Sequence, residues 1–365
     1  MKKILVFRLG ALGDVLMTTP FIKQLGESKK YSIDYMCWKS VESILIGNPH
    51  IENIIAFDEK FFSKINLNNG IKFLKFLVFL WEKRKKYDAV IILDKHIIFN
   101  FMFWIAGYKN RYGFNRLGKE WKFLNKSIYR DKSKREVEYY LSFLELLGIK
   151  ADYKRQKYSF FAGIINKLTK NNKLSDKEQA LVKKYIPRKD EIDSLIKDVK
   201  NKWKKVIWIA SGGWNLLMPK DDCRWWNLKN WEKLAKEFIN QWNIVFLLGS
   251  KNDRKLYIEN QKFIDTLWKY SIHETIYLVS QLDLVVAQEA GFVHFVGCTE
   301  TPLVTIAGPT NPWRFHPFDN HEMPQKPWWI WKMDYECYDE YGSYKNCKGD
   351  EIDKVKVEDV LEFIK

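Results

Sequence analysis

The sequence predicts an α/β protein with two domains, each built on a parallel β-sheet. The chain has 365 residues, more than the roughly 250–300 at which a single hydrophobic core stops growing. Short apolar runs alternate with helical segments, as in βαβ units, and the alternation is interrupted once and then resumes. We therefore expect a first domain at residues 1–160, a Lys- and Asn-rich linker or insertion at 161–204, and a second domain at 205–350. Residues 351–365 are expected to form a helix that packs back across the first domain.

The first strand is predicted within residues 4–9, which hold five apolar residues and an arginine and precede two glycines three positions apart. A helix is expected to begin at Asp14 or just after it. Further strands of the first domain are predicted at residues 31–38, 51–57 and 87–94, and helices at 71–86 and 136–147. In the second domain the predicted strands are 206–210, 244–248, 284–287 and 303–307, with helices at 231–238 and 355–364.

Composition and charge narrow the class of protein. Hydrophobic residues make up 46% and charged residues 29%, values that exclude a disordered or fibrous chain. The formal net charge of +16 predicts attraction to an anionic partner, such as nucleic acid, an acidic bilayer, a phosphorylated glycan or a nucleotide. Five cysteines without a CxxC pair argue against a disulfide framework or a zinc ribbon. Without an apolar signal region at the start, a cytoplasmic location is expected.

Two apolar segments, residues 73–81 and 97–106, are each about half the roughly 20 residues that a membrane span requires. The first ends in five consecutive charged residues, 82–86. An amphipathic segment of this kind either lies on an anionic membrane surface or is a core helix with a solvated basic end. Both alternatives are kept here.

Asp14 follows the first strand, at the edge of a parallel sheet where ligands usually bind. A carboxylate there is suited to act as a general base. The alternative is that Asp14 only caps the helix, since aspartate is favoured at helix N-termini.

Three loops after strands of the second domain are suited to a diphosphate, because glycine-rich turns and helix N-termini expose backbone N–H groups. The loop after the strand at 206–210 also supplies cations for phosphate oxygens. The candidate residues are Ser211, Gly212, Gly213, Lys220 and Arg224 in the first loop, Glu289, Ala290, Gly291 and His294 in the second, and Gly308 and Thr310 in the third.

Three segments, RLGALGDVLMTTPFIKQL at residues 8–25, the glycine loop with Arg224-Trp225-Trp226, and EAGFVHFVGCTETPLVTIAGPTNPWRFHP at 289–317, together resemble the bacterial heptosyltransferases of glycosyltransferase family 9. The resemblance covers nearly the whole chain in the same order. It implies the GT-B architecture, in which two Rossmann-like domains face each other across a cleft. It also implies inverting, metal-independent transfer of a sugar, usually heptose from ADP-heptose, to lipopolysaccharide core at the inner membrane face.

The resemblance gives each matched position an expected role. Asp14 corresponds to the general base, Arg224 to a cation near the donor diphosphate, and Gly291 and His294 to two positions of an Asp-Ser-Gly-x-x-His motif. The first domain is expected to bind the acceptor, with Arg8 and Gly13 on the acceptor side. Glu289 and Ala290 replace the motif's aspartate and serine, which retains a carboxylate and loses a hydroxyl. No metal and no cofactor are expected.

The resemblance also implies partners: a nucleotide-sugar donor, an anionic glycan or glycolipid acceptor, and peripheral contact with the inner membrane surface. One alternative is a transferase of the same fold that acts on a protein hydroxyl or a capsular glycan. A second alternative is a non-catalytic polyanion-binding protein, which would need no acid placed like Asp14. No nucleic acid partner is expected. A nicotinamide-dependent enzyme is disfavoured because GALGD lacks the GxGxxG spacing.

Overall fold

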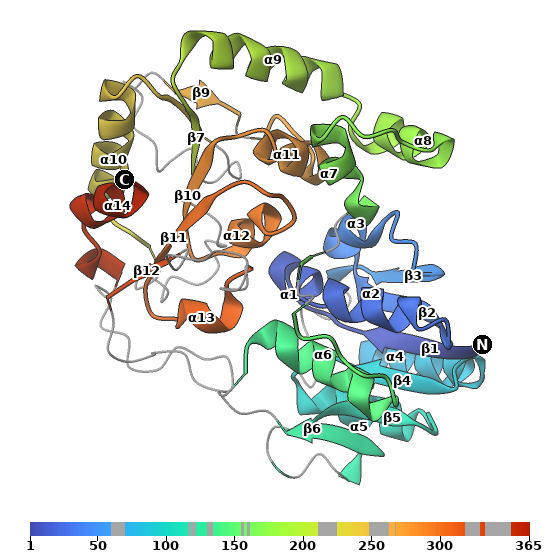
Figure 1. The fold of residues 1–365 in the computed structure, drawn as a ribbon. Helices are drawn as coiled ribbons and strands as arrows, with labels where there is room; N and C mark the ends of the chain where they lie inside the picture. The colour runs from blue at the N-terminus through green and yellow to red at the C-terminus, as the bar shows by residue number, and fades with distance from the viewer. Residues whose placement is uncertain are drawn as a thin grey trace. The chain divides into compact units, whose positions relative to one another are not determined.

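The structure is a computed structural model (Figure 1). It describes residues 1–59, 70–115, 118, 122–129, 134–154, 157–158, 161–210, 225–247, 263–266, 268–317, 329–332 and 352–365, with only the backbone of residues 70–72 and 162. The chain divides into two compact units, residues 1–162 and 163–365. Each unit contains a six-stranded sheet among the described residues. This agrees with the predicted α/β class.

The first sheet has the strand order β3-β2-β1-β4-β5-β6, and all of its pairings are parallel. This order is typical of dinucleotide-binding sheets and reverses between β1 and β4, the point where ligands usually bind. The strands are β1 (Lys2–Phe7), β2 (Tyr31–Trp38), β3 (Asn53–Phe57), β4 (Ala89–Ile92), β5 (Arg111–Asn115) and β6 (Lys126–Tyr129). β5 and β6 were not predicted, because the sequence shows no clear strand pattern there.

Helices cover the two faces of the first sheet. α4 and α5 contribute Phe76, Leu80 and Phe103 to one core, which they share with Leu5 and Phe7 of β1. α2 and α6 pack together on the opposite face (Figure 1). The helices are α1 (Leu12–Leu16), α2 (Thr19–Glu27), α3 (Glu42–Leu45), α4 (Gly70–Lys83), α5 (Ile97–Ile105) and α6 (Glu136–Leu146).

The second sheet repeats this topology. Its order is β12-β11-β10-β7-β8-β9, again parallel throughout, with the reversal between β7 and β10. The strands are β7 (Val206–Ala210), β8 (Ile244–Leu247), β9 (Ile264–Asp265), β10 (Leu284–Gln288), β11 (Leu303–Ala307) and β12 (Trp329–Trp331). The helices are α7 (Ile164–Thr169), α8 (Asp176–Tyr185), α9 (Lys189–Lys202), α10 (Leu228–Asn240), α11 (Ile272–Val279), α12 (Gly291–Val296), α13 (Pro312–Phe315) and α14 (Val357–Ile364).

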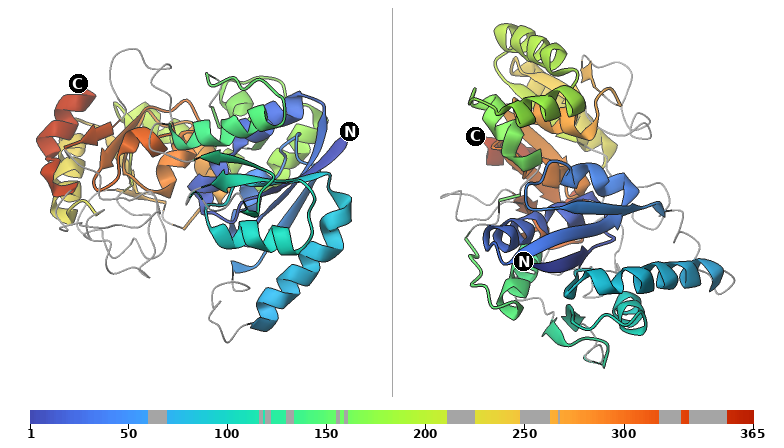
Figure 2. Two further views of the ribbon diagram at one scale, coloured as in Figure 1. Left: turned by 90° about the horizontal axis from the view of Figure 1, so that it is seen from below. Right: turned by 90° about the vertical axis from the view of Figure 1, so that its right-hand side faces the viewer.

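The C-terminal helix α14 packs on the second unit, and its expected return to the first domain stays a prediction. Val355, Val357 and Val360 are buried in the core that α10 forms with the second sheet. α14 and α10 lie side by side in both figures (Figures 1 and 2). Trp226 Nε1 donates to the Val355 carbonyl over 2.7 Å. These apolar contacts place α14 in the second unit.

The segment at residues 161–204, expected as a linker or insertion, contributes α7, α8 and α9 to the second unit. α9 packs against α11, and Arg188 Nη2 pairs with Glu274 Oε2 at 2.8 Å. The buried residues of α9 are Ile192, Ile196 and Val199, which form its one apolar face. Among the described residues, no helix is long and apolar enough to cross a membrane.

Candidate active site

The turn after β1 holds Asp14 in a fixed position. α1 begins at Leu12, two residues before the predicted start, so Asp14 is the third residue of the helix and Ala11 is its N-cap. Asp14 Oδ2 accepts a hydrogen bond from the Ala11 backbone N–H over 3.1 Å. Since alanine has no side-chain acceptor, Asp14 makes only the backward half of a capping box. Asp14 therefore caps the helix through one of its two carboxylate oxygens, Oδ2.

The other oxygen of Asp14 pairs with Arg8. Arg8 Nη2 lies 2.7 Å from Asp14 Oδ1, and Arg8 Nη1 lies 3.3 Å from Asp94 Oδ2. Arg8 is 4% exposed, whereas the Asp14 side chain remains 29% exposed. Arg8, predicted on the acceptor side, is thus a buried bridge between two carboxylates. Only Asp14 offers a substantial surface to a ligand.

Asp94 follows β4, which is the neighbour of β1 at the point where the strand order reverses. Its carboxylate also accepts from the backbone N–H groups of Leu9, over 3.3 Å, and His96, over 3.2 Å. These bonds tie the end of β4 to the end of β1. Asp94 therefore fixes the orientation of Arg8, and through it that of Asp14.

A second ion pair lies close to this network. Lys95 Nζ is 2.8 Å from Glu136 Oε1, and the Tyr140 hydroxyl donates to the same oxygen over 2.9 Å. Glu136 is 1% exposed and lies in the first turn of α6. Asp94, Lys95 and Glu136 were not predicted as site residues. For Asp94 and Lys95 the sequence does contain a hint, since both follow an apolar strand, just as Arg8 follows the first strand.

The charges keep Asp14 ionised. Burial acts to raise the pKa of Asp14, but the Arg8 guanidinium and the Lys95 ammonium outweigh it, so the pKa lies below its usual value. Burial alone would lower the pKa of Arg8, yet the carboxylates of Asp14 and Asp94 hold it well above its usual value. At neutral pH the site contains a carboxylate that is charged and ready to accept a proton.

Gly10 is required for this arrangement. A Cβ built on Gly10 would lie 2.5 Å from Asp14 Cβ and 3.0 Å from Arg8 Nε. Any side chain there would displace one member of the ion pair. Gly13, expected on the acceptor side, is buried in α1, and its carbonyl accepts from the Met17 N–H over 2.9 Å.

In the second unit, four candidate donor residues lie after β10, two in the loop before α12 and two in α12 itself. Ala290 is the N-cap of α12, in an extended conformation and without a side-chain cap. A Cβ on Gly291 would meet no atom within 4 Å among the described residues, so open space adjoins this backbone. Glu289 is half-buried, and His294 is 7% exposed. The first residue of α12 is thus a glycine whose backbone no described side chain covers.

The third predicted loop lies beside it, as parallel pairing requires. Gln288 pairs with Ile306 in the register of β10 and β11, and the Glu289 N–H donates to the Ile306 carbonyl over 2.9 Å. The Gly308 carbonyl accepts from Trp331 Nε1 over 2.9 Å, and Thr310 is 2% exposed. The remaining donor candidates, Ser211, Gly212, Gly213, Lys220 and Arg224, lie outside the described residues. They follow Ala210, which pairs with Ala287 at the same sheet edge.

Comparison with known proteins identifies the family. The model of glycosyltransferase family 9 (heptosyltransferase) matches residues 82–326. The chain belongs to glycosyltransferase family 9. It is therefore a glycosyltransferase. A search of curated proteins gave no match.

Solved structures of this family have the same fold over the whole chain. A family 9 glycosyltransferase from Veillonella parvula is 18% identical with a TM-score of 0.67, covering 99% of this chain and 95% of that one. The ADP-heptose lipopolysaccharide heptosyltransferase II of E. coli is 17% identical, with a TM-score of 0.65 and coverages of 99% and 97%. The E. coli heptosyltransferase WaaC, solved with ADP-2-deoxy-2-fluoro heptose, is 14% identical, with a TM-score of 0.64 and coverages of 99% and 98%. The two-domain GT-B fold is confirmed.

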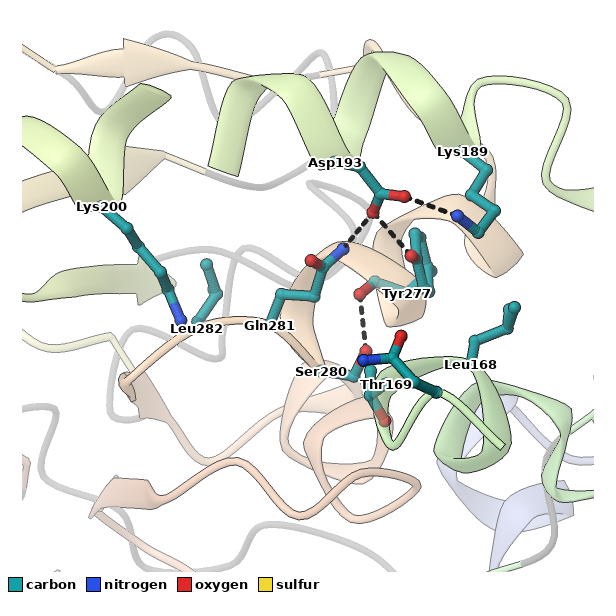
Figure 3. Close-up of a pocket in the computed structure, with 10 residues that line it drawn as sticks. Leu168, Thr169, Lys189, Asp193, Lys200, Tyr277, Ser280, Gln281 and Leu282 are labelled. Carbon is teal, nitrogen blue, oxygen red and sulfur yellow. Dashed lines mark hydrogen bonds and ion pairs between the residues drawn. The ribbon is translucent and has the colours of Figure 1, made fainter. Parts of the chain in front are cut away.

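The second unit of the family 9 chain contains a pocket at the end of its sheet that lies opposite the donor loops. A cavity of about 430 Å³ lies between α7, α9 and α11 (Figure 3). Asp193 pairs there with Lys189 at 2.5 Å, and it accepts from the Tyr277 hydroxyl over 2.6 Å and from Gln281 Nε2 over 3.1 Å. Leu282 lies just before β10, so the cavity adjoins the strand starts, whereas the donor loops follow the strand ends. Its polar groups bond mainly to one another, and we do not place the chemistry of this glycosyltransferase there.

Several other side chains of the family 9 chain have structural roles. Trp226 and Trp231 lie in the core of the second unit, with ring centres 4.9 Å apart, so both side chains serve packing. Cys37 and Cys298 are buried, and the Cys298 thiol donates to the His294 carbonyl over 3.3 Å. Within the part of the chain that the structure describes, no three His, Cys, Asp or Glu side chains come together as a metal site.

Proposed function

We propose that this glycosyltransferase moves a heptose from a nucleoside-diphosphate donor, ADP-heptose or a close relative, to a lipopolysaccharide-core or related glycan hydroxyl. Asp14 is the general base of this reaction. The observation that carries the proposal is the ionised Asp14 carboxylate, held 2.7 Å from Arg8 at the strand-order reversal of the first sheet. Parallel sheets place reacting groups at such points.

The reaction is a single displacement. The acceptor oxygen forms a bond to the anomeric carbon while the bond from that carbon to the diphosphate oxygen breaks, so the anomeric centre is inverted. The hydroxyl proton passes to Asp14 as the new bond forms. A positioned base of this kind typically contributes a factor of about 10²–10⁴ in rate. Arg8 and Asp94 hold the base in place and take no proton themselves.

Charge on the departing diphosphate has to be stabilised without a metal ion. The proposed groups are the backbone at Ala290 and Gly291 and the cations Lys220 and Arg224, which follow β7 in the sequence. Ser211, Gly212, Gly213, Gly308 and Thr310 complete the proposed phosphate-binding edge. Open space at Gly291 supports this placement, because a phosphate oxygen can approach the backbone there. Glu289 and His294 are proposed to support the donor loop.

The donor assignment is supported by family members. WaaC of E. coli was solved with an ADP-heptose analogue and heptosyltransferase II is described as ADP-heptose-dependent. In this chain, Glu289 and Ala290 replace the Asp-Ser pair of the family's motif. These replacements keep a carboxylate in the donor loop and remove one hydroxyl, and ADP-heptose stays the first donor to test.

We propose that the acceptor is an anionic glycolipid and that the protein acts at the cytoplasmic face of the inner membrane. The net charge of +16 supports attraction to anionic headgroups and phosphorylated glycan. Arg8 and Gly13 are buried. We therefore propose that they affect the acceptor indirectly, by holding Asp14 in position.

A thermal-shift series with ADP, GDP, UDP, CMP and NAD tests the donor class, because a ligand that binds only the folded state raises its apparent stability. We expect one nucleoside diphosphate to raise the melting temperature and NAD to have no effect. A shift with heparin or DNA and with no nucleotide would contradict the proposal and favour a polyanion-binding protein.

A further inference from the structure

The first unit has an apolar surface on α4 that no described part of the chain covers. Leu74, Val78 and Trp81 are 60%, 47% and 54% exposed. Their spacing of four and three residues places them on one face of the helix. The opposite face carries Phe76 and Leu80, which are buried against the sheet. The exposed residues are therefore not needed for the core of this unit.

α5 extends this surface. α4 and α5 lie on the same side of the first sheet (Figure 2). Trp104 and Ile105, at the end of α5, are 45% and 51% exposed. Ile105 and Ala106 line a shallow depression of about 190 Å³ together with Leu77, Val78 and Trp81 of α4. We call Leu74, Val78, Trp81, Trp104 and Ile105 the α4–α5 patch.

Cations border the patch. Residues 83–86, Lys-Arg-Lys-Lys, begin two positions after Trp81. Lys109 lies four positions after the end of α5. The Arg84 guanidinium lies 4.1 Å from the centre of the Trp81 ring, and it donates to the Trp81 carbonyl. Lys85, Lys86 and Lys109 are exposed. From residue 74 to residue 87 the only acidic residue is Glu82.

We propose that the α4–α5 patch docks this enzyme on an anionic lipid bilayer. The bilayer surface presents negative headgroups directly above an apolar layer, and the patch presents cations beside apolar and tryptophan side chains in the same arrangement. Tryptophan is favoured at this depth because its ring is amphipathic. This inference rests on the proposed function, in which the acceptor is anchored in a membrane.

Charge complementarity selects the bilayer over a second copy of the chain. Two copies that met through this patch in a symmetric dimer would bring their Lys83–Lys86 segments into proximity, where the adjacent acidic residues in sequence are Glu82 and Asp88, and Asp88 already accepts from the Lys3 N–H. An anionic bilayer carries the opposite charge over its whole area.

Vesicle sedimentation tests the proposal with the full-length protein. The probes are phosphatidylcholine vesicles with and without phosphatidylglycerol, at low and high salt. We expect binding to the anionic vesicles that weakens with salt. The double variant Val78→Gln/Trp81→Gln should lose it, and Lys85→Gln/Lys86→Gln should weaken it by about fivefold per charge.

Matched controls come from the second unit. Trp242→Gln removes an exposed tryptophan, 72% exposed, outside the patch. Lys183→Gln/Lys184→Gln removes an adjacent exposed lysine pair from the last turn of α8. Both controls should bind vesicles as the wild type does. Equal binding by the wild type and Val78→Gln/Trp81→Gln would overturn the proposal, as would a dimer that dissociates only in that variant.

Failure here is distinguishable from failure of the proposed function. The melting-temperature shift with ADP is measured on the same variants, and it should equal that of the wild type in all of them. Absent vesicle binding with a normal ADP shift would refute membrane docking alone. Absent ADP binding with intact vesicle binding would refute the donor assignment alone.

Discussion

Arg8 Nη2 lies 2.7 Å from Asp14 Oδ1, while Asp14 Oδ2 accepts from the N–H of Ala11. Both carboxylate oxygens are thus held from the protein side, and 29% of the side chain still faces outward. A group that is oriented, ionised and partly exposed meets the geometric needs of a general base. The same bonds make it a helix-capping residue, so the two interpretations of Asp14 are compatible.

Asp14→Asn should abolish the base and preserve the fold. The asparagine oxygen can still accept from Arg8 or Ala11, so the fold should be retained, but the melting temperature should fall because the charge paired with Arg8 is lost. We expect the transfer rate to fall by about 10²–10⁴ with unchanged ADP affinity. A discontinuous ADP-release assay, paired with ADP titration calorimetry, measures both quantities.

Asp34→Asn is the matched control for that variant. Asp34 is 4% exposed, lies in the same sheet, and accepts from the Tyr87 hydroxyl over 2.8 Å and from Asn53 Nδ2 over 2.9 Å. Removing its charge should lower stability and leave the transfer rate per folded molecule unchanged. Full activity in Asp14→Asn, or an equal loss in both variants, would remove Asp14 from the catalytic role.

Arg8 variants should shift the acid limb of the pH profile. The pKa of Asp14 lies below its usual value because of Arg8 and Lys95, so kcat/KM of the wild type should decline only at a pH below that at which an ordinary aspartate titrates. In Arg8→Met, burial is less well compensated, so the pKa of Asp14 rises and the decline begins at higher pH. Arg8→Lys retains the charge without the fork and should give a smaller shift. The pH dependence of kcat/KM checks this.

The sign of the stability effect follows from the same pKa. Because the pKa of Asp14 is lower in the folded state, the stabilisation is present above the unfolded value and is lost as pH falls through the folded value. The wild type should therefore be more stable than Arg8→Met at neutral pH, and this difference should shrink as pH falls, because only the wild type loses the stabilisation on acidification. An unchanged acid limb in both Arg8 variants would show that Asp14 does not limit activity at low pH.

Gly291→Ala should affect the donor and not the fold. A Cβ at this position meets no described atom within 4 Å, and the site is at the first residue of α12. The melting temperature should stay the same or rise slightly, since alanine is the better helix former. If a diphosphate approaches this backbone, the dissociation constant for ADP should rise by about tenfold. Unchanged ADP affinity, measured by calorimetry, would place the diphosphate elsewhere.

Val360→Asp should unfold the second unit. Val360 is fully buried in the core that α14 shares with α10, and an unpaired buried charge costs more than about 4 kcal/mol. We expect circular dichroism to show partial unfolding, with the ADP-dependent stabilisation lost. Glu362→Ala, on the exposed side of the same helix, is the control. Normal ADP stabilisation in Val360→Asp would mean that α14 does not support the unit proposed to bind the nucleotide.

The sequence predicted most of the strands because their signal is local. Residues 31–38, 206–210 and 303–307 coincide with β2, β7 and β11, each a short apolar or β-branched run beside a turn. β5 and β6 were not predicted, since Arg-Tyr-Gly-Phe-Asn and Lys-Ser-Ile-Tyr become strands only through pairing with β4 and with each other. Tertiary context overrides weak propensity there.

The site was predictable only in part. Asp14 and Gly291 stand out because each follows a strand within a recognisable motif. Asp94 and Glu136 are more than 70 residues from Arg8 in sequence, and only the pairing of β1 with β4 and the packing of α6 bring them near. For α14, the expected position came from family resemblance, whereas Val355, Val357 and Val360 match the apolar surface of α10.

Transfer to a defined acceptor tests the central claim most directly. Purified protein is incubated with ADP-heptose, a truncated lipopolysaccharide that lacks core heptose, and EDTA, and the product is analysed by mass spectrometry. The account predicts an acceptor heavier by one heptose residue, with inverted anomeric configuration and equimolar ADP, and no product with Asp14→Asn. Product formation by Asp14→Asn at the wild-type rate, or strict dependence on Mg²⁺, would contradict it.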